Sequence, residues 1–163
     1  MHFASPVGRL EIRGGTEAVH ALAWRSDEAA PFAPLFGAVP SPLWGRGVEA
    51  WLADYFGGRF RAPDFPLDPG GTPFQVRVWR ALLALPAGSV QTYGELARGL
   101  GYAGGSGARA VGGAMRANSL PLILPCHRVV GARGALGGYS GVGGIETKRR
   151  LLAWERGEEG LGP

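Results

Sequence analysis

The residues best suited to chemistry are Cys126 and His127, which are neighbours in the sequence. A thiolate is a strong nucleophile, and a neutral imidazole can take a thiol proton near neutral pH. Cys126 is the only cysteine, so no intramolecular disulfide can form. A lone cysteine in apolar surroundings is most often an inert buried side chain with a raised pKa. The adjacent His127 and Arg128 favour a reactive thiol over that alternative.

Two prolines flank the apolar segment that ends at the cysteine. Pro121 and Pro125 exclude an ordinary helix and predict an extended path through residues 120–130. Consecutive residues of an extended chain point to opposite faces, so His127 does not simply lie beside the Cys126 sulfur. A turn or a bridging water is needed to join the two groups.

The imidazole also needs a partner that fixes its tautomer. The acids of the C-terminal half are Glu95, Glu146, Glu155, Glu158 and Glu159. Glu95 is occupied by a capping box that begins at Thr92. We therefore expect Glu146 or Glu155, on the last helical stretch, to orient the histidine.

Helices with clear start signals precede the cysteine segment. Thr72-Pro73-Phe74-Gln75 is a capping box with proline at the first helical position, and Thr92-Tyr93-Gly94-Glu95 is a second one. The glycine-rich residues 101–105 then turn the chain toward a third helix, with Ser106 as its cap. Two short helices joined by a glycine turn predict a helix-turn-helix.

One face of that third helix is basic. Arg109, Gly113 and Arg116 recur at i, i+4 and i+7, with Gly112 beside them. Glycines would let a phosphodiester backbone come close, and Arg109 adds its charge to the positive end of the helix dipole. The alternative is a surface helix that each glycine weakens by about 1 kcal/mol relative to alanine. The helix-turn-helix setting favours a nucleic-acid contact.

The N-terminal part of the chain has a different pattern. Residues 7–25 alternate apolar and polar side chains around a glycine turn, which predicts a β-hairpin. Ser41-Pro42 offers an N-cap for a helix that Gly57-Gly58 ends. Residues 61–71 are rich in proline and glycine and predict a linker, so we place a domain boundary at residue 71.

Composition narrows the class of protein. The 163 residues carry 17 Lys plus Arg and 13 Asp plus Glu, and the net charge is −2 over residues 1–70 but +6 over residues 71–163. All cations but Lys148 are arginine, which suits phosphate contacts, although a GC-rich genome also enriches arginine. No apolar run approaches a membrane span, and one cysteine with three histidines gives little support for structural zinc. A cytoplasmic protein that meets a polyanion fits best.

Four motifs occur in a fixed order in the C-terminal half. They are Arg109-Ala110-Val111-Gly112, Met115-Arg116-Ala117-Asn118, Pro125-Cys126-His127-Arg128-Val129 and Gly138-Tyr139-Ser140-Gly141. Together they resemble the O6-alkylguanine-DNA alkyltransferase family, from about Thr72 to Glu155 and more weakly in the N-terminal segment. The resemblance implies an α/β fold, with a small ribonuclease H-like domain over residues 1–71. A mainly helical, winged-helix-like DNA-binding domain with a helix-turn-helix would follow over residues 72–163.

The resemblance implies DNA repair by direct reversal. Cys126 would take a methyl or other alkyl group from O6-alkylguanine in duplex DNA and keep it, in a single irreversible turnover. O4-alkylthymine is left open as a second substrate. The resemblance further implies no cofactor, no metal, no membrane and no obligate protein partner, and a monomer in the cytoplasm.

A role follows for each residue that matches the family. His127 would act through a water as the base, with Glu155 orienting it. Tyr93 would turn the nucleotide out of the duplex and protonate the departing base, and Arg109 would fill the vacated place. Asn118 would brace the active-site turn. The other matches are Gly112, Gly113 and Arg116 on the DNA side, Pro121, Val129, Tyr139 and Ser140 around the base pocket, and Arg128 in a structural salt bridge.

The sequence departs from the family pattern at two points, and two other functions remain open. Ser119 stands where the family commonly has proline, which could loosen the turn, and the zinc ligands of some members have no counterpart here. One alternative function is a sensor that binds alkylated DNA without reacting and recruits other repair factors. The other is a Cys/His hydrolase or acyltransferase, for which no oxyanion-hole motif is evident.

Overall fold

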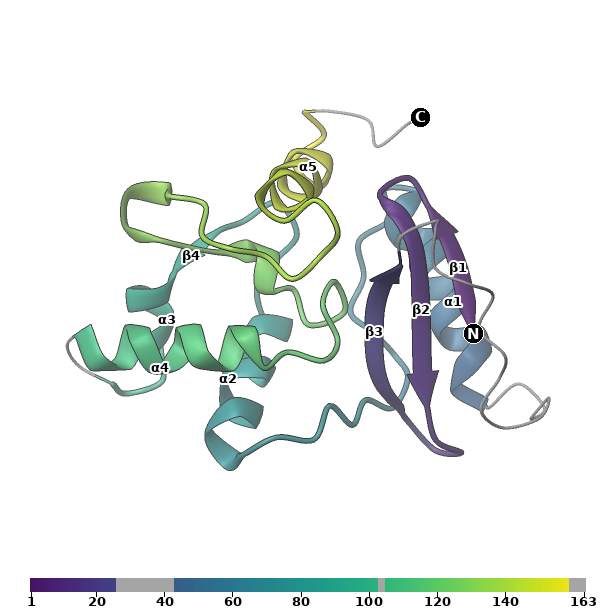
Figure 1. The fold of residues 1–163 in the computed structure, drawn as a ribbon, viewed down its shortest axis with the longest axis horizontal. Helices are drawn as coiled ribbons and strands as arrows, with labels where there is room; N and C mark the ends of the chain where they lie inside the picture. The colour runs from purple at the N-terminus through teal and green to yellow at the C-terminus, as the bar shows by residue number, and fades with distance from the viewer. Residues whose placement is uncertain (26–42, 103–104, 159–163) are drawn as a thin grey trace.

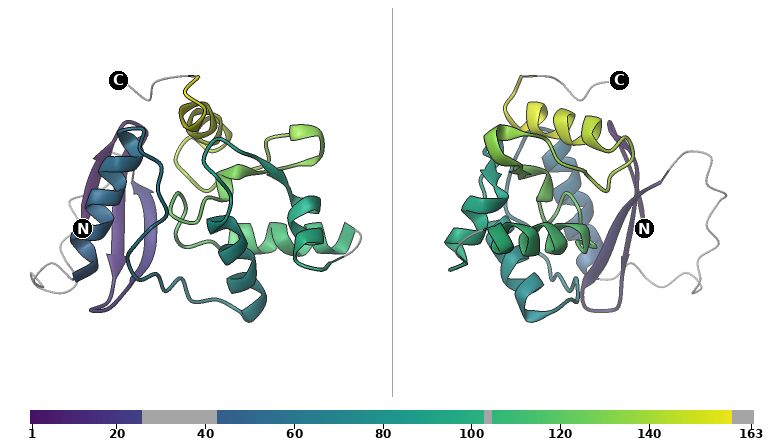
Figure 2. Two further views of the ribbon diagram at one scale, coloured as in Figure 1. Left: turned by 180° about the vertical axis from the view of Figure 1, so that it is seen from behind. Right: turned by 60° about the vertical axis from the view of Figure 1, so that its left-hand side comes forward.

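The structure is a computed structural model that describes residues 1–25, 43–102 and 105–158. Its elements form two groups that lie side by side (Figures 1 and 2). One group is a three-stranded sheet with a helix across one face, and the other is a helical group with a two-stranded sheet. Buried apolar side chains of both groups form one continuous core. The fold is therefore α/β, as the sequence predicts.

Residues 2–25 form an antiparallel sheet in the order β1-β2-β3. Its strands are β1 (His2–Ser5), β2 (Gly8–Gly14) and β3 (Val19–Arg25). The predicted hairpin is confirmed as β2 and β3, in which Leu10 lies opposite Trp24 and Ile12 opposite Leu22. These four side chains are buried, since alternate residues of a strand face the same side. Strand β1 has no counterpart among the predicted elements, because its four residues are too few to show a clear alternation.

Helix α1 (Leu43–Phe56) lies across one face of this sheet (Figure 2). Its apolar side chains recur at helical spacing, and Val48 and Leu52 are fully buried. The predicted stop at Gly57-Gly58 is confirmed, with Gly58 in the left-handed region at a φ of 78°. The predicted N-cap at Ser41-Pro42 lies outside the described residues.

The segment predicted as a linker packs along the sheet. The Val19 amide donates to Pro66 O at 3.1 Å, and the Asp68 amide donates to Val19 O at 2.9 Å. Phe65 is buried and packs edge-on against Trp51 of α1. The segment is thus fixed to the first group, and the domain boundary at residue 71 stays a prediction.

The second group follows from residue 73. It contains α2 (Pro73–Leu83), β4 (Gln91–Thr92), α3 (Tyr93–Gly99), α4 (Gly105–Arg116), η1 (Cys126–Arg128), β5 (Val129–Val130), η2 (Ala132–Gly134) and α5 (Ile145–Glu155). The parallel pairing of β4 with β5 places the start of α3 beside the end of η1. None of the helices in the described ranges is long and apolar enough to cross a membrane.

Both predicted capping boxes are confirmed. The Gln75 amide donates to the Thr72 hydroxyl at 3.3 Å, and the Glu95 amide donates to the Thr92 hydroxyl at 3.1 Å, with the reciprocal bonds also present. The prediction that Ser106 caps the third helix is wrong, because α4 begins at Gly105 and Ser106 lies in its first turn. A run of glycines marks the neighbourhood of a helix start without fixing its first residue.

Candidate active site

A cleft of about 1130 Å³ opens beside α3 and α4, and Cys126 is part of its wall. The predicted site residues that line it together with Cys126 are Tyr93, Arg109, Gly112, Arg116, Tyr139 and Ser140. Six others are not part of the lining, namely Gly113, Asn118, Pro121, His127, Val129 and Glu155. Of the four residues predicted for the base pocket, Tyr139 and Ser140 line the cleft, whereas Pro121 and Val129 are buried outside its lining.

The segment before the cysteine is folded into turns. The Leu124 amide donates to Leu120 O at 2.8 Å, and Leu122 lies in the left-handed region with a φ of 75°. Residues Cys126–Arg128 then form the 3-10 turn η1. The predicted extended path is therefore wrong, because a proline restricts only itself and the residue before it and leaves tight turns open.

Asn118 holds these turns together. Its Nδ2 donates to Leu124 O at 2.9 Å, and its Oδ1 accepts from the Leu120 amide at 2.9 Å. Both partners are backbone groups of a buried turn, and the Leu124 carbonyl also accepts from the Cys126 amide at 2.7 Å. Asn118 therefore has the contacts expected of a residue that braces the active-site turn. The neighbouring Ser119 is also tied down, because its carbonyl accepts from the Leu22 amide at 2.8 Å and its hydroxyl donates to Pro69 O at 3.3 Å.

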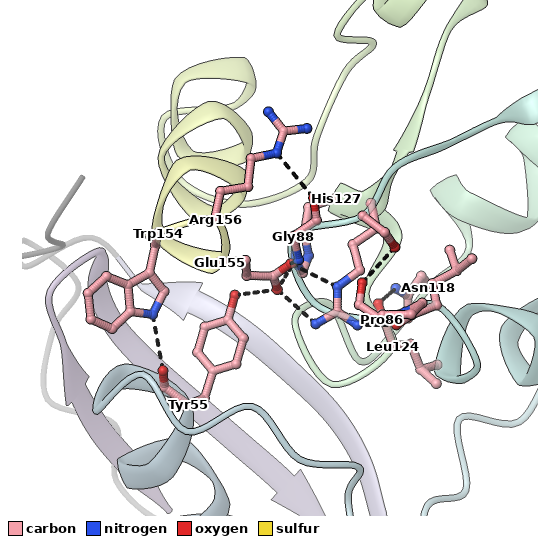
Figure 3. A network of polar contacts seen from close by, with 12 residues as sticks. Tyr55, Pro86, Gly88, Asn118, Leu124, His127, Trp154, Glu155 and Arg156 are labelled. Atoms are coloured by element: carbon pink, nitrogen blue, oxygen red, sulfur yellow. Dashed lines mark hydrogen bonds and ion pairs between the residues drawn. The ribbon is translucent and has the colours of Figure 1, made fainter. Parts of the chain in front are cut away.

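His127 and Glu155 form a buried pair, shown in Figure 3. The His127 Nε2 lies 2.7 Å from Glu155 Oε1, and both side chains are fully buried. Glu155 is thus the orienting acid of the two that the sequence left open, since Glu146 is exposed and pairs with Arg149. Burial acts to raise the pKa of Glu155, but His127 and Arg128 outweigh it and hold that pKa well below its ordinary value.

An ionised Glu155 fixes the proton on the histidine ring. The carboxylate can only accept, so Nε2 carries the hydrogen and Nδ1 keeps a free lone pair. Burial lowers the pKa of His127, which favours this neutral form. The Nδ1 atom is buried and has no hydrogen-bond partner among the described residues. It is therefore placed to accept a proton.

Arg128 secures the other side of the glutamate. Its Nε donates to Glu155 Oε2 at 2.9 Å and its Nη2 to Oε1 at 2.8 Å, while Nη1 donates to Leu85 O at 2.6 Å. Such a two-pronged contact is the strongest geometry that arginine makes with a carboxylate. The predicted structural salt bridge of Arg128 is therefore present.

The Cys126 thiol lies at the edge of the protein interior and is only 6% exposed. Burial raises the pKa of this thiol, and a hydrogen bond with Asn118 and the positive charge of Lys148 offset part of the rise. Lys148 is itself fully buried, and its Nζ donates to Val129 O at 2.6 Å. The cysteine is thus neither a freely exposed thiol nor one in purely apolar surroundings.

The part of the cleft wall that comes from α3 and α4 includes two arginines and a tyrosine. Arg109 and Arg116 are exposed on α4, and Tyr93 is half-buried at the start of α3, where burial raises the pKa of its hydroxyl. A Cβ atom added at Gly112 or Gly113 would meet no atom of the described protein within 4 Å. The packing of the protein therefore does not require glycine at these two positions.

Tyr139 is another residue of the cleft lining. Its ring packs edge-on against His127 at 6.3 Å and against Trp24 of β3 at 5.7 Å between centroids. Its hydroxyl is buried without a hydrogen-bond partner in the part of the chain that the structure describes. The described residues contain no group of three or more His, Cys, Asp or Glu side chains that could hold a metal ion, and the metal-free site stays a prediction.

Comparison with known proteins identifies the family. Residues 73–157 match the family described as "6-O-methylguanine DNA methyltransferase, DNA binding domain". A methylated-DNA--protein-cysteine methyltransferase of Mycobacterium tuberculosis is 41% identical over 152 residues, which are 93% of this chain and 88% of the relative. The chain belongs to the 6-O-methylguanine DNA methyltransferase family. A relative of the same description from Methanosarcina acetivorans is 37% identical over 94% of this chain and 95% of its own.

Solved structures of this methyltransferase family have the same fold. The M. tuberculosis OGT in complex with DNA has a TM-score of 0.81 and 39% identity, over 98% of this chain and 94% of that one. The O6-methylguanine methyltransferase of the same organism has a TM-score of 0.78 and 40% identity, over 97% and 92%. The resemblance inferred from the four motifs is therefore confirmed.

Three contacts of the site could not be found from the motifs. The Tyr55 hydroxyl of α1 donates to Glu155 Oε1 at 2.8 Å, and the Gly88 amide donates to Oε2 at 2.9 Å (Figure 3). The third is the hydrogen bond from Lys148 Nζ to Val129 O. In the sequence Lys148 stands out only as the one lysine among the seventeen Lys and Arg residues. No local pattern marks Tyr55 or Gly88, because they lie 100 and 67 residues away from the glutamate.

Proposed function

We propose that this chain repairs O6-alkylguanine in duplex DNA by moving the alkyl group irreversibly to Cys126, one group per protein molecule. The observation that carries the proposal is the position of Cys126 in the wall of the α3–α4 cleft, next to the buried His127–Glu155 pair. The names of the relatives support it, since they are methylated-DNA--protein-cysteine methyltransferases, and so does the relative solved in complex with DNA.

The transfer follows from the protonation states of the site. His127 Nδ1 takes the thiol proton of Cys126 through a water, and Glu155 stabilises the imidazolium that results. The thiolate attacks the alkyl carbon, a C–S bond forms, and the bond from that carbon to O6 breaks with its electrons moving into the base. Tyr93 donates a proton to the departing guanine, for which its raised pKa keeps the hydroxyl protonated. The thioether has no route back, so the protein acts once.

The cleft can receive only a base that has left the duplex. Extrusion costs a few kcal/mol, which a wedge and a fitted pocket offset. In the proposal Tyr93 crowds the nucleotide outward and Arg109 fills its place in the stack. Contacts to the backbone come from α4, at Gly112, Gly113 and Arg116. Tyr139 and Ser140, which line the cleft, would contact the base, while Pro121 and Val129 are buried and could act only through the residues that line it.

The finer fold description and the cellular setting belong to the same proposal. Residues 1–71 would form a ribonuclease H-like domain, and residues 72–163 a winged-helix-like domain whose helix-turn-helix is α3 and α4. The chain would act as a cytoplasmic monomer without cofactor, metal or obligate protein partner. Whether O4-alkylthymine is a second substrate is decided by the assay described next, with that base in the duplex.

The proposal is tested by intact-protein mass spectrometry after incubation with a duplex that contains O6-methylguanine. We expect one methyl group per protein, located on Cys126 by peptide mapping, with no further increase on longer incubation. Tight binding to the duplex without an adduct would favour the sensor instead. Continued turnover of an activated ester would favour the hydrolase.

Arg109→Ala is expected to slow repair in duplex DNA much more than reaction with a free O6-alkylguanine base. The reason is that Arg109 is proposed to fill the place of the extruded base in the DNA stack, and a free base needs no extrusion. The measurement is the rate of alkyl transfer from each substrate at the same pH and salt concentration. Arg46→Ala is a matched control, because Arg46 is an exposed arginine of α1 outside the cleft lining. Equal slowing of Arg109→Ala on both substrates would contradict the wedge role.

A further inference from the structure

The carboxylate of Glu155 accepts hydrogen bonds from four residues that belong to three segments of the chain. Oε1 accepts from His127 Nε2 at 2.7 Å, from Arg128 Nη2 at 2.8 Å and from the Tyr55 hydroxyl at 2.8 Å. Oε2 accepts from Arg128 Nε at 2.9 Å and from the Gly88 amide at 2.9 Å. Tyr55 is the member of this group that comes from the first group of elements, through α1 (Figure 3).

We propose that Tyr55 is a positioning residue for alkyl transfer, which sets the basicity of His127 by hydrogen bonding to the same Glu155 oxygen. The inference rests on the proposed role of His127 as the base. It assigns to α1 a direct effect on the chemistry at Cys126, beyond its packing against the sheet.

The shared oxygen provides the physical link. Each donor on Oε1 takes up part of the negative charge of the carboxylate, so less of that charge is left to stabilise an imidazolium. Tyr55 therefore competes with His127 for the same lone-pair electrons. Removing the Tyr55 hydroxyl should strengthen the pull of Glu155 on the His127 proton and raise the pKa of His127.

Tyr55 is held in place and stays a donor. Its side chain is only 2% exposed, its ring stacks on Trp51 at 5.6 Å, and its carbonyl accepts from Trp154 Nε1 at 3.0 Å. Burial and the adjacent Glu155 raise the pKa of the Tyr55 hydroxyl well above its ordinary value. The hydroxyl therefore keeps its proton over the whole pH range in which His127 titrates.

Other charged and titratable groups act on the same pair and would remain unchanged in a Tyr55 variant. Arg128 from η1 and Lys148 from α5 both lower the pKa of His127, and Glu155 raises it. Tyr139 lies against the His127 ring, and Cys126 is its neighbour in the chain. Because these groups stay in place, a shift in the variant reports on the Tyr55 hydroxyl.

The test is Tyr55→Phe, which keeps the ring and removes the hydroxyl. We expect the pKa of His127, measured by NMR on histidine-labelled protein, to rise by about half a unit, in the range that one lost hydrogen bond to a carboxylate can supply. The acid limb of the pH profile for transfer from a free O6-alkylguanine base should move upward by the same amount. A free base removes DNA binding and base extrusion from the measurement.

Trp154→Phe is the matched control. It removes a different α1–α5 hydrogen bond, from Trp154 Nε1 to Tyr55 O, without taking a donor from Glu155. We expect a loss of stability in urea and an unchanged His127 titration. If Tyr55→Phe behaves in the same way, Tyr55 has only a structural role and the proposal is overturned.

A second variant covers the case in which Tyr55→Phe does not fold. Replacing Tyr55 alone by 3-fluorotyrosine keeps the shape and makes the hydroxyl a stronger donor, so the His127 pKa should fall. No shift, or a rise, would overturn the proposal. A shifted His127 titration with an unmoved rate profile would overturn the effect on transfer and count against His127 as the base. Absence of a Cys126 adduct in the unsubstituted protein would instead count against the proposed function itself.

Discussion

Cys126→Ser is expected to bind an O6-methylguanine duplex as the unsubstituted protein does and to form no alkyl adduct. The serine hydroxyl has no accessible ionised form near neutral pH, and one buried imidazole with a lowered pKa cannot activate it as it can a thiol. Binding should persist because phosphate contacts dominate the affinity, and the proposed function places those contacts on α4 and not on η1. We expect a dissociation constant within about twofold of the unsubstituted value, since none of those contacts is removed.

Two measurements on the same preparation check this expectation. Intact mass after incubation gives the adduct, and fluorescence anisotropy with labelled duplex gives the affinity at a stated salt concentration. Because DNA binding by a basic face releases counterions, both proteins should lose affinity with the same slope as salt is raised. An alkyl adduct on the serine variant, or on any residue other than Cys126 in the unsubstituted protein, would contradict alkyl transfer to Cys126.

Glu155→Gln is expected to destabilise the protein by about 3–5 kcal/mol, the usual cost of breaking a buried ion pair by removing one partner. Arg128 would be left as a buried cation without its carboxylate, and the Tyr55 hydroxyl and the Gly88 amide would lose a charged acceptor. Alkyl transfer should fall as well, because an amide does not fix the His127 tautomer or stabilise its imidazolium. Urea unfolding and the transfer rate measure the two effects.

The pH dependence of the free energy of unfolding distinguishes the buried Glu155 carboxylate from an exposed one. The folded pKa of Glu155 lies well below its unfolded value, so its contribution is present above about pH 4.3 and is lost as the pH falls further. Glu155→Gln should therefore lose part of the acid sensitivity of the unsubstituted protein. Glu146→Gln is the matched control, since that carboxylate is exposed and its pair with Arg149 contributes little to stability. A Glu155→Gln variant as stable as Glu146→Gln would contradict the buried network.

The features predicted correctly from the sequence are those that depend on residues close together in the chain. The capping boxes at Thr72 and Thr92 and the stop at Gly57-Gly58 need only residues within one turn of the helix end, and each is confirmed. The β2–β3 hairpin needs only alternation over a dozen residues. The four motifs, which are short and ordered, were enough to identify the family.

The misplaced or missing features depend on contacts across the chain. The prolines at 121 and 125 excluded a helix, but the turns between them depend on Asn118, whose side chain bonds two backbone groups. The choice between Glu146 and Glu155 depends on how α5 is rotated against η1, which its sequence leaves open. Tyr55 could be found only from a fold that brings α1 to α5.

The pairing of His127 with Glu155 has a consequence for the order in which the protein is made. The two residues are 28 positions apart, and Glu155 ends the last described helix, so the cysteine and histidine leave the ribosome before the acid that orients them. Until α5 docks, the imidazole has no fixed tautomer and the thiol has neither its buried lysine nor its base in place. A nascent chain therefore exposes an ordinary cysteine. For a protein that reacts once, this order delays activation of the thiol until the cleft that selects its substrate has formed.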